Sequence, residues 1–130
     1  MLDLRFGRLL LSLCTALSFA LPLQAADDPR QRTVEALKQA LQADPQNAEL
    51  WIHLGFAYRK IEQLDAAREA FEKAISISPQ NGDALFMLGL IYEKQNRKAD
   101  ALRAWKQYLN SSPTPEKRAM AESHIHQLSQ

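Results

Sequence analysis

The stretch AELWIHLGFAYRKIEQLDAAREAFEKAISISP, residues 48–79, decides the fold. Its apolar and small residues return 34 positions later, where Leu54-Gly55 becomes Leu88-Gly89 and Phe71 becomes Trp105. The other pairs related by this step are Tyr58 and Tyr92, Ala67 and Ala101, and Pro79 and Pro113. A fixed period of this length indicates stacked supersecondary units, none of which can bury its apolar face alone.

At these positions the chain closely resembles the tetratricopeptide repeat (TPR) family. The first copy carries the whole signature, and the second has Leu85 where the first has Trp51. The signature residues are Trp51, Leu54, Gly55, Tyr58, Ala67, Phe71, Ala74, Pro79, Leu88, Gly89, Tyr92, Ala101, Trp105 and Pro113. The resemblance implies an all-α solenoid of antiparallel helix pairs. Its expected parts are a half repeat at 29–45, repeats at 48–81 and 82–115, and a capping helix at 115–128, all within a domain of residues 26–130.

Gly55 lies in the middle of a predicted helix, where glycine costs roughly 1 kcal/mol relative to alanine. A neighbouring helix that approaches closely at this point would compensate for that cost. We expect the approach to occur at Ala67 or Ala74 of the following helix.

The last helix is predicted to close the C-terminal end of the stack, with Ala121, Ile125 and Leu128 on its apolar side. Tyr108 is bulky at a repeat position where the earlier copies carry alanine. We expect Ala119 and Ser123 of the last helix to leave room for its ring.

The first 25 residues have the pattern of a secretory signal peptide. Arg5 and Arg8 precede an uncharged apolar run at 9–23, and small residues then lead into an acidic stretch. We expect cleavage after Ala25, with Ala26 as the second choice. The run is shorter than the ~20 apolar residues of a membrane-spanning helix, and a retained anchor is the alternative. The sequence therefore predicts an exported, periplasmic protein.

The charge balance of the mature chain argues against nucleic acid as a partner. Removal of the signal takes away two of the 16 basic and one of the 15 acidic residues, which leaves no net charge. Nucleic-acid binding calls for a clear basic excess. Cys14, the only cysteine, lies in the signal, so no disulfide can form and helix packing must supply the stability.

The first helix of each repeat carries a second apolar stripe opposite its core-facing side. Ile52 and Phe56 lie on this stripe in one repeat, and Phe86 and Leu90 lie on it in the next. Exposed apolar stripes often mark interaction sites, and in the TPR family this side lines the concave groove that holds peptides or helices. The resemblance thus implies a partner-binding groove made of Glu49, Ile52, His53, Phe56, Lys60, Phe86, Met87, Leu90 and Lys94. Ordinary packing beneath neighbouring helices is the alternative.

The residues give no support to catalysis. His124 and His126 are two apart, about 200° around a helix, and cannot readily share a metal ion. No glycine-rich phosphate loop occurs, and no nucleophile has a recognisable base and orienting group. We expect no enzyme, cofactor or small-molecule substrate. Ile52 and Phe56 stand where some family members place the lysine and asparagine of a carboxylate clamp, so binding of chaperone tails is not implied.

The predicted function is a non-enzymatic protein–protein interaction adaptor of the cell envelope, which binds a partner peptide or helix in the groove. An oligomeric scaffold is one alternative, because the N-terminal half repeat can self-associate or extend a stack. Envelope proteins that resemble this chain also deliver unfolded cytochrome c chains for maturation. Chaperone-like binding of apocytochrome c is therefore a further alternative.

Overall fold

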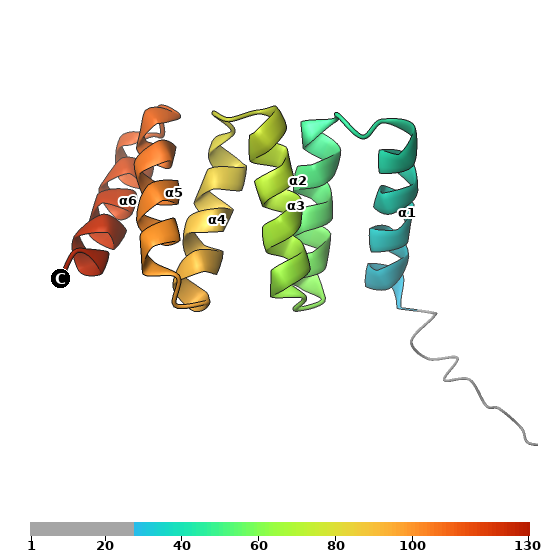
Figure 1. The fold of residues 1–130 in the computed structure, drawn as a ribbon, viewed down its shortest axis with the longest axis horizontal. Helices are drawn as coiled ribbons and strands as arrows, with labels where there is room; N and C mark the ends of the chain where they lie inside the picture. The colour runs from blue at the N-terminus through green and yellow to red at the C-terminus, as the bar shows by residue number, and fades with distance from the viewer. Residues whose placement is uncertain (1–27) are drawn as a thin grey trace, which may run out of the picture.

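The computed structural model describes residues 28–130, so the predicted signal peptide lies outside the described residues. This part of the chain forms six helices and no strand: α1 (Pro29–Ala43), α2 (Ala48–Lys60), α3 (Leu64–Ile77), α4 (Gly82–Lys94), α5 (Lys98–Asn110) and α6 (Pro115–Leu128). The helices follow one another from α1 at one end of the molecule to α6 at the other (Figure 1). The predicted all-α solenoid is confirmed. None of the six is both long and apolar enough to cross a membrane.

Side-chain caps fix where the first helix of each repeat begins. Asn47 Oδ1 accepts a hydrogen bond from the backbone N–H of Leu50 at 3.3 Å. Asn81 Oδ1 accepts the same bond from the backbone N–H of Ala84 at 3.0 Å. Each cap satisfies one of the donors that a helix leaves free in its first turn. The repeat therefore starts at the same place in both copies.

An aromatic ring lying on a glycine joins the two helices of each repeat. Phe71 of α3 is fully buried, and a Cβ added to Gly55 of α2 would lie 2.7 Å from its Cζ. In the next repeat a Cβ on Gly89 of α4 would lie 2.6 Å from Cε2 of the buried Trp105. Any side chain at either glycine would occupy the space of the ring. Close approach, rather than an unusual backbone angle, requires glycine here.

The predicted close approach at Gly55 is confirmed, but its assignment to Ala67 or Ala74 was wrong. Both alanines are fully buried, and Phe71 between them supplies the contact. Small residues on either side let α3 come near enough to α2 for the ring to reach the glycine.

Helix α6 closes the stack through Ala121 rather than through the residues predicted to make room for Tyr108. Ala121 is fully buried in a cluster with Trp105 and Tyr108, and Ile125 and Leu128 pack against the same cluster. The predicted apolar side of α6 is therefore confirmed.

Ala119 and Ser123 are exposed, so the expectation that they accommodate Tyr108 was wrong. Both lie two positions from Ala121, about 200° around the helix, and face away from α5.

A polar contact reinforces the packing of α6. The imidazole of His124 stacks on the indole of Trp105, with ring centroids 4.6 Å apart and planes 16° from parallel. Nδ1 of His124 lies 2.9 Å from Oε1 of Glu93, and the same oxygen accepts a hydrogen bond from Trp105 Nε1 at 2.6 Å. One carboxylate on α4 thus ties α5 and α6 together, which gives His124 a packing role.

The substitution Gly55→Ala should lower the free energy of unfolding by about 1–2 kcal/mol, measured by urea denaturation followed by circular dichroism. Overpacking against the buried Phe71 ring costs about 1–3 kcal/mol and exceeds the gain of about 1 kcal/mol in helix propensity. Gly82→Ala is the matched control, because its nearest neighbour, 3.0 Å away, is the small Oγ of Ser111. A Gly55→Ala protein as stable as the wild type would contradict this account.

Candidate functional site

A hollow lies on the side of the molecule formed mainly by α2, α4 and α6, and we name it the inner groove. Its volume is about 470 Å³. The lining residues are Phe56 and Arg59 of α2, Asp83, Phe86 and Met87 of α4, Tyr108 of α5, and Lys117 and Met120 of α6. A hollow of this size is in the range of sites that hold a small ligand or a few side chains of a partner.

The aromatic walls of the inner groove rest on the core of each repeat. The ring of Phe56 meets the buried Phe71 edge to face at 5.2 Å between centroids. The ring of Phe86 meets the buried Trp105 in the same way at 5.5 Å, and it also leans on Tyr108 at 5.7 Å. Phe56 and Phe86 are each half-buried. The groove therefore offers apolar surface whose position is fixed from behind by buried rings.

Two cations and one carboxylate surround this apolar surface. The guanidinium of Arg59 lies 5.9 Å from the ring centroid of Phe56, and its Nη1 is 3.8 Å from Sδ of Met87. Lys117 stands on the α6 side, and Asp83 is the only carboxylate among the lining residues. The groove therefore carries a net positive charge beside its aromatic walls.

The hydroxyl of Tyr108 stays protonated in this setting. Burial raises the pKa of Tyr108, and the nearby carboxylate of Asp83 raises it further. A protonated phenol can donate a hydrogen bond to a ligand carboxylate or carbonyl.

A second hollow, the end hollow, lies between α1 and α2 and has a volume of about 370 Å³. It is lined by Pro29, Arg30, Thr33 and Leu37 of α1 and by His53, Phe56, Ala57 and Lys60 of α2. Phe56 borders both hollows. Five of the nine residues predicted to form one groove line these hollows, and they are divided between the two.

The structure buries two of the residues predicted to form the groove floor. Ile52 and Met87 are each 4% exposed and belong to one core cluster with Phe71 and Ile91. The prediction that Ile52 lies on an open binding surface was wrong, whereas Met87 lines the inner groove although it is almost wholly buried. Helix α4 packs beside the α2–α3 pair, and this contact covers the side of α2 that a wheel of α2 alone leaves open. Only the edge of Met87 borders the inner groove.

Of the other predicted groove residues, Leu90 is half-buried and packs against the cluster formed by Leu85, Trp105 and Ala121. It thus supports α6 instead of facing the inner groove. The predicted polar residues are all exposed: Glu49, His53, Lys60 and Lys94. Among these four, His53 and Lys60 line the end hollow, whereas Glu49 and Lys94 line neither hollow.

The predicted set omitted five residues that line the inner groove: Arg59, Asp83, Tyr108, Lys117 and Met120. Tyr108 had a signal in the sequence, since it replaces the alanine that earlier copies carry at its repeat position. Lys117 and Met120 had no such signal in the sequence. They face the groove because of the rotation of α6, which depends on how Ala121 packs on α5.

Two models of the tetratricopeptide repeat family match the chain, one over residues 48–81 and the other over residues 70–103. The chain carries tetratricopeptide repeats. The TPR signature at residues 48–79 and the packing of an aromatic ring on a glycine in both repeats agree with this result. Comparison with curated proteins gives no significant match.

Solved structures of another protein are similar to the chain. Two crystal structures of MamA align with TM-scores of 0.67 and 0.68 at 26% identity, and each covers 76% of this chain. The alignments cover 52% and 56% of the MamA chains, so this chain spans about half their length.

Two peptide complexes have the same fold. The second TPR domain of human RPAP3, in complex with the HSP70 peptide SGPTIEEVD, aligns with a TM-score of 0.66 at 20% identity, over 78% of this chain and 82% of that domain. The first TPR of Spaghetti (RPAP3), bound to the HSP90 peptide SRMEEVD, aligns at 0.67 and 16% identity, over 77% of each chain.

Replacement of the inner-groove ring in Phe86→Asp should lower the free energy of unfolding by about 3 kcal/mol, because Phe86 packs on the buried Trp105. Met120→Asp introduces the same carboxylate on α6, where the side chain is half-buried and faces the hollow. It should cost less than about 1 kcal/mol. Thermal and urea unfolding of both variants measure the difference. Equal losses would mean that Phe86 does not support the core.

Proposed function

We propose that this chain is an exported, non-enzymatic adaptor that holds an apolar segment of another protein in the inner groove. The observation that carries the proposal is the pairing of half-exposed Phe56 and Phe86 with the cations Arg59 and Lys117 around one hollow. Aromatic side chains and arginine are the residues that contribute most energy at protein interfaces.

The fold supports this proposal. TPR proteins are generally adaptors, and the two RPAP3 domains with this fold hold peptides of other proteins. The inner groove has walls that packing has already fixed, since Phe71 and Trp105 support the two half-buried rings from behind. A fixed wall reduces the entropy that binding would otherwise cost.

The charges favour one class of segment, in which apolar side chains alternate with acidic ones. Arg59 and Lys117 can each pair with a carboxylate, and the protonated hydroxyl of Tyr108 can donate to one. The resemblance to the TPR family places Ile52 and Phe56 where some members carry the lysine and asparagine of a carboxylate clamp. An internal or amphipathic segment therefore fits the inner groove better than a chaperone tail.

Charge reversal in the inner groove tests the proposal. We expect fluorescein-labelled peptides of about 12 residues that combine leucine and phenylalanine with glutamate to bind the wild type. Arg59→Glu with Lys117→Glu should weaken binding at least tenfold, since two interface ion pairs of about 0.7 kcal/mol each contribute that factor. Fluorescence anisotropy measures the affinities, with C-terminal peptides of a c-type apocytochrome as a further series.

Lys106→Glu with Lys98→Glu is the matched control, because it makes the same charge change at exposed sites of α5 that line neither hollow. The control should bind as the wild type does. Equal affinity of the groove variant, or preference of the wild type for lysine-containing peptides of the same length, would refute the proposal.

Export is the second part of the proposal and rests on residues 1–25. In a Gram-negative host the full chain with a C-terminal tag should accumulate in the periplasm, and mass spectrometry of the intact protein should place its first residue at Ala26. Deletion of residues 2–25 should leave the protein in the cytoplasm. Recovery of the whole chain in the membrane fraction, with its N-terminus intact, would show that residues 1–25 are retained as an anchor and are not cleaved.

A further inference from the structure

Two clefts open on the side of the molecule formed by α1, α3 and α5, and the repeat relates them. The first lies between α1 and α3, and the second lies between α3 and α5. Every lining residue of the second cleft stands 34 positions after a lining residue of the first. The two clefts therefore have equivalent backbone positions but different side chains, and they can be compared directly.

The second cleft is small, about 160 Å³, and its charged groups and its tyrosine hydroxyl are paired. The hydroxyl of Tyr92 donates to Oε1 of Glu72 at 2.6 Å, and Arg68 Nη1 donates to the same oxygen at 2.8 Å. Burial raises the pKa of Tyr92, and the bond to Glu72 adds to the effect. Asp100 forms ion pairs with Arg97 and Arg103. These paired side chains occupy much of the second cleft and leave it smaller than the first.

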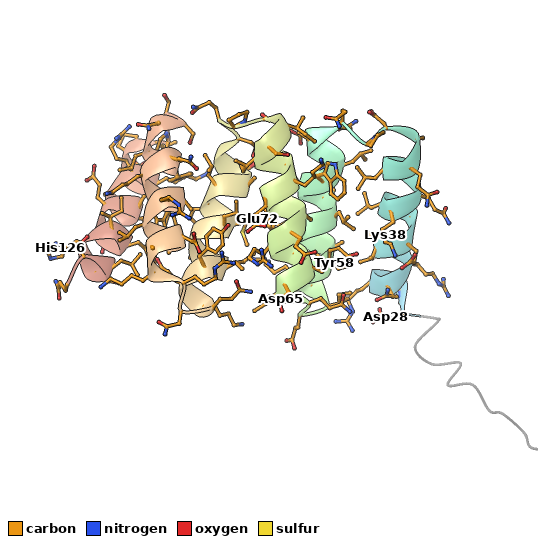
Figure 2. All side chains as sticks on the ribbon, in the orientation of Figure 1. Asp28, Lys38, Tyr58, Asp65, Glu72 and His126 are labelled. Atoms are coloured by element: carbon orange, nitrogen blue, oxygen red, sulfur yellow. The ribbon has the colours of Figure 1, made fainter. Side chains whose placement is uncertain are left out.

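The first cleft is about 530 Å³ and lacks the groups that fill the second. Lys38 stands where the second cleft has Glu72, so the hydroxyl of Tyr58, the counterpart of Tyr92, finds no carboxylate there. It has no hydrogen bond within residues 28–130. Ala66 takes the place of Asp100, and Lys73 takes the place of Gln107. Figure 2 shows Lys38 on α1, near Tyr58, and Glu72 on α3.

The charges of the first cleft favour an anion. Lys38 contacts Glu35 on its own helix at 3.2 Å, but both side chains are about half exposed and such pairs are weak. Lys73 has no ion pair within the described chain. Glu69 is the one carboxylate that lines the first cleft; it is 70% exposed and lies 3.6 Å from Arg68. Two lysines and an unpaired phenol thus face the cleft.

The floor of the first cleft is apolar. Leu41, Leu54 and Ala70 are buried beneath it, and the half-buried Trp51 lines one end. Nε1 of Trp51 already donates to the carbonyl of Pro45 at 2.9 Å, so the indole presents an apolar face to the cleft. From Trp51 to Tyr58 the α2 floor runs about 10 Å. This length matches about three residues of an extended peptide.

We propose that the cleft between α1 and α3 binds a short acidic segment of a partner protein. An aromatic or large aliphatic side chain of the segment packs on the floor beside Trp51. A neighbouring carboxylate pairs with Lys38 and Lys73 and accepts the hydrogen bond of the Tyr58 hydroxyl. This site is separate from the inner groove, with which it shares no lining residue.

Trp51 supplies a direct readout in the full-length protein labelled with nitrogen-15. The chain has two tryptophans, and the indole of Trp105 is fully buried and bonded to Glu93. Titration with the acetylated and amidated tripeptide Glu-Phe-Glu should shift the indole resonance of Trp51 and leave that of Trp105 in place. The Lys-Phe-Lys peptide should shift neither. Phenylacetate tests a free acid as the source of the carboxylate and should shift Trp51 at least tenfold more weakly.

The role of the two lysines in binding is tested by variants that place the residues of the second cleft in the first cleft. Lys38→Glu with Lys73→Gln introduces the residues that the second cleft holds at the equivalent positions, so the helices should remain intact. The affinity for Glu-Phe-Glu should fall at least tenfold, whereas Tyr58→Phe should reduce it about threefold. Lys106→Glu on α5, which is exposed and lines neither cleft, should leave the affinity unchanged.

Arg59→Glu with Lys117→Glu alters only the inner groove and should leave the Trp51 shift unchanged, which separates this site from the proposed adaptor function. Three results would overturn the inference: no shift of Trp51 with Glu-Phe-Glu, an equal shift in the variant that copies the second cleft, or phenylacetate binding as tightly as the tripeptide. Thermal melting by circular dichroism confirms that each variant compared is folded.

Discussion

A ring pressed on a glycine is the contact on which the rest of this structure depends. Phe71 lies on Gly55 and Trp105 lies on Gly89, close enough that no Cβ fits at either glycine. This contact sets the distance between the two helices of a repeat. It also supports the inner groove, because Phe56 and Phe86 rest edge to face on the same two buried rings. Core and binding surface thus share one aromatic stack in each repeat.

The two repeats share the packing of a ring on a glycine, but they differ in the polar side chains that line their clefts. Tyr58 and Tyr92 occupy equivalent places on α2 and α4, yet only Tyr92 meets a carboxylate. Lys38 in place of Glu72 leaves the hydroxyl of Tyr58 unpaired, and Ala66 in place of Asp100 removes a charged group that fills the second cleft. Charged side chains at the rim of a packed repeat cost little stability. Such positions can therefore diverge while the stack of helices stays the same.

The C-terminal end of the stack is completed by chemistry that lies outside the repeat pattern. Helix α6 is held by the buried Ala121 and by the stacking of His124 on Trp105. The carboxylate of Glu93 is hydrogen-bonded to the rings of both Trp105 and His124. The resulting rotation of α6 turns Lys117 and Met120 toward the inner groove. The closing helix therefore contributes to the inner groove as well as to the packing of the last core cluster.

The sequence by itself determined the helices, their pairing and most of the core positions, because the 34-residue period and the Leu-Gly, tyrosine, aromatic and proline spacings act locally. It also predicted that Gly55 marks a close approach and that one side of the first helices carries extra apolar residues. Only the tertiary structure decided that Phe71 makes the approach and that Ile52 and Met87 are buried where α2, α3 and α4 meet. It also decided that Phe56 and Phe86 line the hollows whereas Leu90 packs under α6. The physical reason is that a helical wheel describes one helix, whereas exposure depends on which neighbour packs against it.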